Sequence, residues 1–243
     1  MKDDVLGAVS FLTIFGRGHP PTGYSRYWFA LSGAIVGLVS GSVWWLLGKL
    51  NLHLLDAGLV VLSVLIVTGA IHLDGLADSA DGLLAHLRTA RRFEVMSSPE
   101  VGVFAVTAVV MSLILQTAAL SVLRPNPLFL IGLMGLTRTL CGLAIEVLPY
   151  AKAEGIVSAF NNGSRKRMAG KLVLMAESLV FALLVEVSMP QRAFAVLIVA
   201  CAIQALVLWR GKGLLGGYTG DVLGASITAS ETVAFVVAAL IQR

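Results

Sequence analysis

Apolar residues form seven long runs along this chain, and each run is about 20 residues long, which suits a helix that crosses a bilayer. The runs cover about residues 28–48, 55–73, 101–123, 128–148, 172–189, 193–209 and 222–241. The polar segments between them are short and leave no room for a second domain. We therefore predict an all-α, polytopic integral membrane protein whose 243 residues form a single domain.

A shorter apolar segment, VLGAVSFLTIF at residues 5–15, precedes the first run. It follows two aspartates and lacks a small-x-small cleavage site, so it does not match a secretory signal peptide. We expect an interfacial or re-entrant helix at this position.

The composition agrees with a chain embedded in a membrane. Hydrophobic residues make up 57% of the sequence and charged residues 13%, whereas soluble domains carry about 25% charged residues. Cys141 and Cys201 both lie in apolar runs, so the sequence gives no support for a disulfide framework.

The basic residues sort between alternate loops. Thirteen fall on one side of the predicted membrane: Lys2, Arg17, Arg26, Arg88, Arg91, Arg92, Lys152, Arg165, Lys166, Arg167, Lys171, Arg210 and Lys212. Four fall on the other side: Lys49, Arg124, Arg192 and Arg243. The positive-inside rule then places the N-terminus in the cytoplasm and the C-terminus outside. The polar motifs described next would all emerge at the cytoplasmic face.

Three aspartates follow the second apolar run. Asp74, Asp78 and Asp81 are spaced i, i+4 and i+7, which places them within about 60° of one another on a helix. Carboxylates held this close repel one another unless a cation lies among them. Mg²⁺ is a natural candidate, because it prefers oxygen ligands. The alternative is a helix start that favours negative charge, but this effect fades within one turn and the acids span two. His72 is expected to point away from the Asp74 face and to be structural.

A second polar segment, LLGGYTGDVLGA at residues 214–225, comes directly before the last run. Its glycines, Gly217 and Gly220 among them, permit backbone N–H groups to approach a phosphate at a helix start. Asp221 has two interpretations: an N-cap of the last helix, or a metal ligand or polar contact facing the aspartate cluster.

Ionisable residues within the apolar runs are costly unless they are paired. They are Arg138, Glu146, Glu177, Glu186 and Glu231. Glu146 is near the end of a run and is expected to reach water. For Arg138 and Glu231, a buried ion pair and a contact with substrate remain equally open.

Small residues line one face of the first run. Gly33, Gly37 and Gly41 recur every four residues, a spacing that lets helix backbones approach closely in lipid. We expect a packing role for this face, either within one subunit or between subunits of a homo-oligomer.

Two segments, HLDGLADSADG at residues 72–82 and LGGYTGDVLGA at residues 215–225, resemble the most distinctive motifs of the cobalamin synthase family, the adenosylcobinamide-GDP ribazoletransferases. Further matches follow in the family order: FLT at residues 11–13, Arg91 with EVM at 94–96, Thr137-Arg138, and YAKAEG at 150–155. The resemblance extends over nearly the whole chain.

The resemblance implies a multi-pass enzyme of the cell inner membrane that depends on Mg²⁺. Its implied reaction transfers the adenosylcobinamide-phosphate moiety from adenosylcobinamide-GDP to α-ribazole or α-ribazole 5′-phosphate, and releases GMP. These two substrates and the lipid bilayer are the expected partners, and nucleic acid is not.

The resemblance also gives roles to residues of this chain. Asp74 and Asp78 would hold the metal, and Asp81 would complete its shell or accept the hydroxyl proton. The other expected catalytic and substrate-binding residues are Arg91, Arg138, Lys152, Gly217, Thr219, Gly220, Asp221 and Glu231. Three positions depart from the family pattern: Ser98 and Thr228 replace usual acids, and Ala30 replaces a usual proline.

Two other functions fit parts of the pattern. A CDP-alcohol phosphotransferase also has aspartates at a membrane surface, but it usually has Ala-Arg where this chain has Asp78-Ser79. A transporter would explain the spans and the intramembrane acids, but transporters tend to have repeated halves, which this sequence does not show.

Overall fold

The computed structural model describes residues 1–16, 18–152, 159–160 and 168–242, and this part of the chain is helical without a β-strand. Its α-helices are α1 (Lys2–Leu12), α2 (Phe29–Leu47), α3 (His53–Thr68), α4 (Ile71–Leu84), α5 (Thr89–Val95), α6 (Val103–Val122), α7 (Pro127–Val147), α8 (Met168–Ser188), α9 (Ala193–Leu215) and α10 (Gly220–Ile241). Two 3₁₀-helices, η1 (Ser25–Trp28) and η2 (Gly48–Leu50), flank α2. Seven residues used in the sequence predictions lie outside the described ranges: Arg17, Glu154, Gly155, Arg165, Lys166, Arg167 and Arg243.

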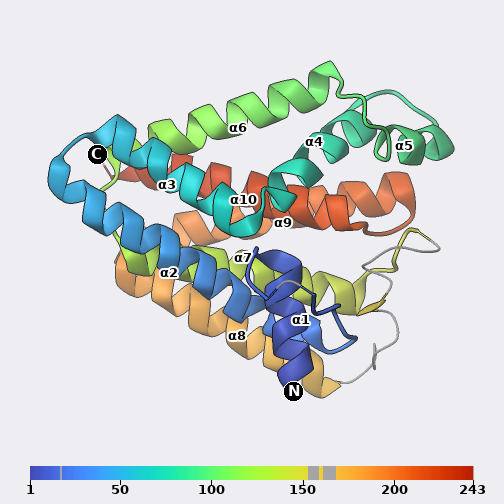
Figure 1. The fold of residues 1–243 in the computed structure, drawn as a ribbon, viewed down its shortest axis with the longest axis horizontal. Coiled ribbons are helices and arrows are strands. Elements are labelled where there is room, and N and C mark those ends of the chain that lie inside the picture. Colours follow the sequence, from blue (N-terminus) through green and yellow to red (C-terminus); the bar gives the residue numbers. More distant parts are fainter. Residues whose placement is uncertain (17, 153–158, 161–167, 243) are drawn as a thin grey trace.

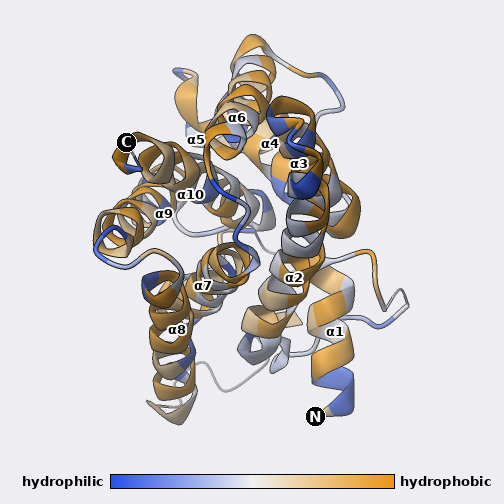
Figure 2. Ribbon diagram, turned by 90° about the vertical axis from the view of Figure 1, so that its left-hand side faces the viewer, coloured by the Kyte–Doolittle hydropathy of each residue, from blue (hydrophilic) through white to orange (hydrophobic). Residues whose placement is uncertain are grey.

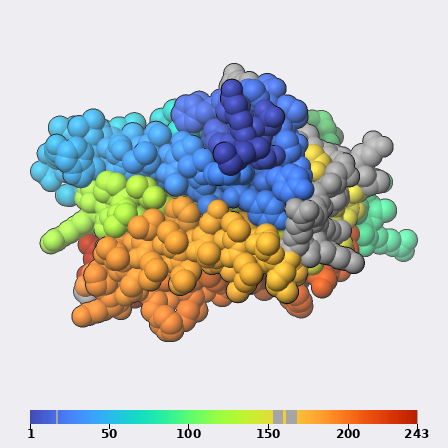
Figure 3. Space-filling model, turned by 90° about the horizontal axis from the view of Figure 1, so that it is seen from below, coloured from blue at the N-terminus to red at the C-terminus, as the bar shows by residue number. Residues whose placement is uncertain are grey.

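Six of the described helices are long and apolar enough to cross a membrane, which confirms the all-α, polytopic class. They are α2 with its flanking 3₁₀ turns, α6, α7, α8, α9 and α10. The long helices run side by side along the longest axis of the molecule (Figure 1). Apolar residues dominate them, while polar residues gather in the connections and at the start of α1 (Figure 2). α7 is the most deeply buried, whereas α8 lies on the outside, where it forms a ridge beside α2 (Figure 3).

The second predicted span, 55–73, is wrong as one continuous helix. α3 ends at Thr68, and α4 leaves it at an angle of 91°. Gly69 and Ala70 form the corner, with φ values of 61° and 57° in the left-handed region. Glycine tolerates this conformation, whereas alanine is strained in it. The turn places the three aspartates on a separate helix that does not continue the direction of α3.

The glycine face of α2 packs against α7 of the same chain. A Cβ at Gly37 would lie 2.6 Å from the backbone of Leu130 and Ile131, and one at Gly41 would lie 2.8 Å from Pro127. A Cβ at Gly33 would lie closer still to the backbone of Met134. This confirms the predicted packing role and shows that the face is used within one chain.

The expectation that Glu146 reaches water is wrong. Its side chain is fully buried and accepts hydrogen bonds of 2.6 Å from Arg26 Nε and from the Tyr27 hydroxyl. Arg26 Nη1 also donates to the carbonyl oxygen of Phe160 at 2.8 Å. Because a buried carboxylate requires a partner, this pair fixes the chain before α2 to the end of α7.

Candidate functional site

The two polar motifs meet where α4 crosses the start of α10. Gly75 of α4 lies against the backbone of Asp221, where an added Cβ would be 2.7 Å from the carbonyl oxygen. One turn along α10, a Cβ at Gly224 would lie 3.2 Å from the Cα of His72. The absence of side chains at these two glycines allows the helices to touch, and this contact brings the aspartates of α4 beside Asp221.

A short backbone bridge positions the third part of the site. The Tyr218 N–H donates to the Pro149 carbonyl, and the Ala151 N–H donates to the Tyr218 carbonyl, each at 2.9 Å. Gly217 is buried against Pro149, where no side chain would fit. The bridge directs Lys152 to Asp221, with 3.3 Å between Nζ and Oδ2.

The interpretation of Asp221 as the N-cap of the last helix is wrong. Thr219 is the cap, and its hydroxyl accepts from the Val222 N–H at 3.2 Å. Asp221 instead lies in the first turn of α10, within 3.3 Å of both Lys152 Nζ and Thr219 Oγ1. Its carboxylate does not cap the helix and lies beside Lys152 in the site.

Asp78 lies in α4, outside the six straight spans, and it is half-buried. Burial raises the pKa of its carboxyl to about 6, and the negative charges of Asp74 and Asp221 add to this effect while Lys152 opposes it. Asp74, Asp78 and Asp221 thus form one electrostatic group, although they come from two distant segments. A cation at this group would relieve their repulsion.

A cavity of about 310 Å³ opens beside this group. Asp74, Lys152, Gly220 and Asp221 line one part of it, and His72 and Tyr150 also contribute. Burial, and then the charge of Asp221, raises the pKa of the Tyr150 hydroxyl above its usual value. The rest of the lining is apolar: Phe11, Leu12, Phe29, Ile71, Cys141, Leu223, Gly224 and Ile227. The cavity is therefore charged on one side and apolar on the other.

Asp81 lies apart from this cavity although it shares α4 with Asp74 and Asp78. Its carboxylate accepts hydrogen bonds from the Gly102 N–H at 2.6 Å and from the Ala105 N–H at 3.0 Å. These N–H groups belong to the start of α6, where a carboxylate satisfies unpaired donors. The structure gives Asp81 a helix-capping position, and its role as a metal ligand stays a prediction.

Arg91 is also separated from Asp74 and Asp221. It is exposed on α5 and pairs with Glu94 at 2.6 Å. Together with Asp81 and Ser98 it lines a second cavity, of about 610 Å³, between α4, α5 and the start of α6. The predicted site residues are thus divided between two cavities that lie at different points along α4.

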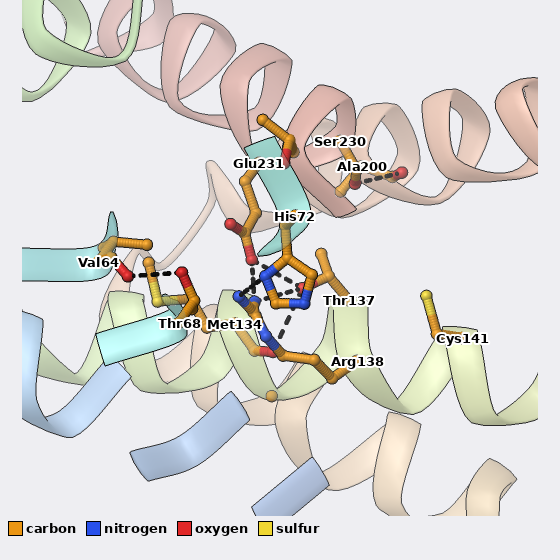
Figure 4. Close-up of polar contacts among 12 residues, drawn as sticks. Val64, Thr68, His72, Met134, Thr137, Arg138, Cys141, Ala200, Ser230 and Glu231 are labelled. Carbon is orange, nitrogen blue, oxygen red and sulfur yellow. Dashed lines mark hydrogen bonds and ion pairs between the residues drawn. The ribbon is translucent and has the colours of Figure 1, made fainter. Parts of the chain in front are cut away.

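Arg138 and Glu231 form a buried ion pair, one of the two alternatives left open by the sequence (Figure 4). Arg138 has no exposed side-chain surface, and Thr137 donates to the same glutamate oxygen at 2.8 Å. His72 Nδ1 lies 3.5 Å from Arg138 Nη2. His72 is buried, as expected for a structural residue, but its side chain also lines the 310 Å³ cavity. Thr228 borders a hollow of about 20 Å³ beside this pair.

The donor set suits Mg²⁺ better than a metal that needs a protein cage. In the described part of the chain, no three His, Cys, Asp or Glu side chains are arranged to hold a metal ion by themselves. Mg²⁺ is usually bound by one or two carboxylates together with water and substrate phosphate. The half-buried Asp78 beside Asp74 fits this kind of site, because burial and then the neighbouring carboxylates raise the pKa of its carboxyl, and a bound cation would offset both effects.

Sequence reasoning missed the apolar half of the cavity. Phe11 and Phe29 come from α1 and α2, and their rings lie 5.9 Å apart. Phe11 belongs to the FLT motif, which was the available signal, but nothing local connects that motif to the aspartates of α4. The role of Arg92 was missed as well: its buried side chain donates to the carbonyls of Gly82 and Ala85 and holds the end of α4.

Comparison with known proteins shows which family the chain resembles along its length. The family model of cobalamin-5-phosphate synthase matches residues 4–239. The adenosylcobinamide-GDP ribazoletransferase of Desulfitobacterium hafniense is 34% identical over 215 residues, which are 85% of this chain and 82% of that protein. The enzyme of the same name from Chlorobium phaeovibrioides is 31% identical over 244 residues, covering 98% of this chain and 97% of the relative.

A third relative of that name, from Azorhizobium caulinodans, is 34% identical over 228 residues, or 88% of this chain and 83% of its own length. No solved structure is significantly similar to the chain. The family match spans both polar motifs and the segments that bring them together. This chain belongs to the cobalamin-5-phosphate synthase family.

Proposed function

We propose that this protein transfers the adenosylcobinamide-phosphate moiety of adenosylcobinamide-GDP to α-ribazole or α-ribazole 5′-phosphate. The relatives' names give this donor and a ribazole acceptor. The observation that carries the proposal is the meeting of Asp74, Lys152 and Asp221, from three distant segments, at one cavity. Phosphoryl transfer needs positioned charge of this kind more than covalent help from the protein.

In the proposed reaction, a ribose hydroxyl oxygen attacks the phosphorus next to the cobinamide. A new P–O bond forms, the P–O bond to the bridging oxygen breaks, and GMP leaves with that oxygen. Asp221 accepts the hydroxyl proton, because it lines the cavity and belongs to the helix opposite the other two acids. Lys152 contacts a phosphate oxygen through a charge-assisted hydrogen bond.

Asp74 and Asp78 are the residues that would hold Mg²⁺. The bound ion would neutralise charge on the pyrophosphate. Neither Arg138 nor Glu231 lines the cavity, so we assign them a structural role through their buried ion pair and no contact with substrate. Gly217 and Gly220 act through the backbone, the first in the bridge that carries Lys152 and the second at the start of α10.

The site is proposed to face the cytoplasm of a bacterial inner membrane. α4 and the start of α10, which carry the aspartates, lie at the same end of the molecule as α5 and the end of α9 (Figure 1), where Arg88, Arg91, Arg92, Arg210 and Lys212 are found. This end would be inside by the positive-inside rule. A homo-oligomer stays a proposal too, and it would need a surface other than the glycine face of α2.

GMP release by the purified protein in lipid vesicles tests the reaction. We expect release that requires Mg²⁺ and both substrates, and that is abolished by Asp78→Ala while the protein remains folded. Release of CMP from a CDP-alcohol, with none of GMP, would instead identify a CDP-alcohol phosphotransferase. Undiminished GMP release by Asp78→Ala would remove the aspartate group from the mechanism.

A further inference from the structure

The apolar half of the 310 Å³ cavity includes two aromatic rings, among aliphatic side chains, that the phosphoryl-transfer chemistry does not use. Phe11 and Phe29 line it, and their rings stack with 5.9 Å between centroids. Both rings also pack edge-on against Phe160, at 5.4 Å and 5.5 Å. Phe29 and Phe160 are almost fully buried, whereas Phe11 is partly exposed. The Phe11 ring is therefore held in place by Phe29 and Phe160, and its exposed part can contact a ligand.

The size of the cavity excludes the larger substrate group. A volume of about 310 Å³ is at the lower end of the range of about 300–1,000 Å³ for pockets that take drug-sized ligands. A corrin ring with its amide side chains is much larger than a nucleoside and would have to remain outside. A single nucleoside or nucleotide is the largest substrate part that fits.

The chemistry of the lining separates the two bases that remain. Guanine presents several donors and acceptors on its edge, and burying them against apolar side chains would leave them without partners. A benzimidazole-type base joined to ribose is a flat, largely apolar ring system with one free acceptor nitrogen. Phe11, Leu12, Phe29, Ile71 and Ile227 offer apolar contact and few polar groups. This lining suits the benzimidazole and not guanine.

We propose that the ribazole acceptor binds in this cavity, with its base against Phe11 and Phe29 and its ribose directed to Asp74, Lys152 and Asp221. The proposal rests on the proposed function for the identity of the acceptor. In this placement, Phe11 and Phe29 select the base of the acceptor. It also places the attacking hydroxyl at the charged side of the cavity, while the corrin stays at its mouth.

Acceptor binding measured without the donor tests this placement separately from the reaction. α-Ribazole 5′-phosphate is titrated into the full-length protein in lipid, and its Kd is measured for wild type, Phe11→Ala and Phe11→Tyr. We expect Phe11→Ala to raise the Kd by about 5- to 150-fold, the usual effect of losing one aromatic–base contact. Phe11→Tyr keeps the aromatic ring and should have a Kd close to that of the wild type. Phe194→Ala, an exposed residue on the outer surface of α9, is the matched control.

Kinetics give a second readout. Phe11→Ala should raise the KM for the ribazole substrate and leave the KM for adenosylcobinamide-GDP unchanged. The placement is overturned if a folded Phe11→Ala variant keeps the wild-type Kd, or if only the donor KM rises. If Phe104→Ala raised the Kd more than Phe11→Ala does, the acceptor would bind instead in the cavity between α4, α5 and α6, and the placement would be overturned. If Phe11→Ala does not fold, Phe11→Leu replaces it and should also raise the Kd. Wild-type protein that binds the ribazole but releases no GMP would contradict the proposed reaction alone.

Discussion

The Asp78 carboxyl is half-buried beside Asp74 and Asp221, so its ionisation depends on pH close to neutrality. Its pKa is raised from 3.8 to about 6, which means that the folded state holds this proton more tightly than the unfolded state. Between these pH values the folded protein binds more protons, and stability therefore falls as pH rises. Burial, and then the charges of Asp74 and Asp221, thus destabilise the ionised form of Asp78 when no cation is present.

We predict that the metal-free protein loses stability as pH rises from about 4 to about 6, and that Asp78→Asn removes this step. Thermal unfolding in detergent with a chelator, followed across this pH range, measures it. Added Mg²⁺ should restore stability above about pH 6 and have little effect below it, because protons compete with the metal for the carboxylate. An identical pH dependence in wild type and Asp78→Asn would contradict the prediction.

The two ion pairs formed by Glu231 and Glu94 should differ strongly in their effect on stability. Glu231→Ala leaves Arg138 buried without its partner, which we expect to lower the free energy of unfolding by about 3–5 kcal/mol. Glu94→Ala breaks a pair whose side chains are both more than 60% exposed, and should change stability by about 0–1 kcal/mol. Denaturation of both variants in the same detergent gives the comparison. Similar losses would mean that the buried pair is not structural.

At the scale of elements, the site depends on how closely α4 and α10 pack. Gly75 lies against the Asp221 backbone, where a methyl group would be 2.7 Å from an oxygen that cannot easily move. The Asp74 side chain is one residue away. A small separation of the two helices would therefore shift the acids relative to Asp221 and Lys152.

We expect Gly75→Ala to lower the rate of GMP release by about 100-fold, because displacements of about 1 Å have this effect in active sites. Gly58→Ala is the matched control, since the nearest atom to its new methyl group would be 4.0 Å away. Initial rates and melting temperatures of both variants separate misplacement from unfolding. A normal rate in a folded Gly75→Ala variant would show that the α4–α10 contact does not position the site.

The turn between α3 and α4 could not be predicted from the hydropathy pattern. Apolar residues continue through Gly69, Ala70 and Ile71, so hydropathy alone predicts one long helix. The left-handed conformation at Gly69 and Ala70 ends α3 instead. Glycine signals a possible end, but alanine does not, and the 91° turn is stabilised by the packing of α4 against α10 and α6.

At the scale of the whole molecule, the proposed reaction requires that the end carrying α4 and α5 faces the cytoplasm. His53 lies at the start of α3, and His86 lies between α4 and α5, at the other end of the molecule; both side chains are exposed. In a chain with Cys141 and Cys201 changed to alanine, we expect an impermeant maleimide to label His53→Cys in intact cells. His86→Cys should be labelled only after the inner membrane is opened. The reverse pattern would place the candidate site outside the cell and contradict the proposed reaction.

The sequence alone determined the class of the protein, the glycine face of α2, the family, and the positions of six spans to within about four residues, except that α9 ends six residues after the predicted span 193–209. These features are local: a run of apolar residues or a four-residue glycine spacing has the same meaning wherever the segment lies. Asp74, Asp78 and Asp81 were placed correctly on one helix for the same reason.

Only the tertiary structure decided which of the polar residues share a site. It joined Asp74 and Asp78 to Asp221 and Lys152, placed Asp81 and Arg91 at a second cavity further along α4, and paired Arg138 with Glu231. These outcomes depend on contacts between segments up to about 150 residues apart, such as Gly75 with Asp221. Helix periodicity fixes the direction of a side chain on its own helix, but the neighbour that it meets depends on how the helices pack.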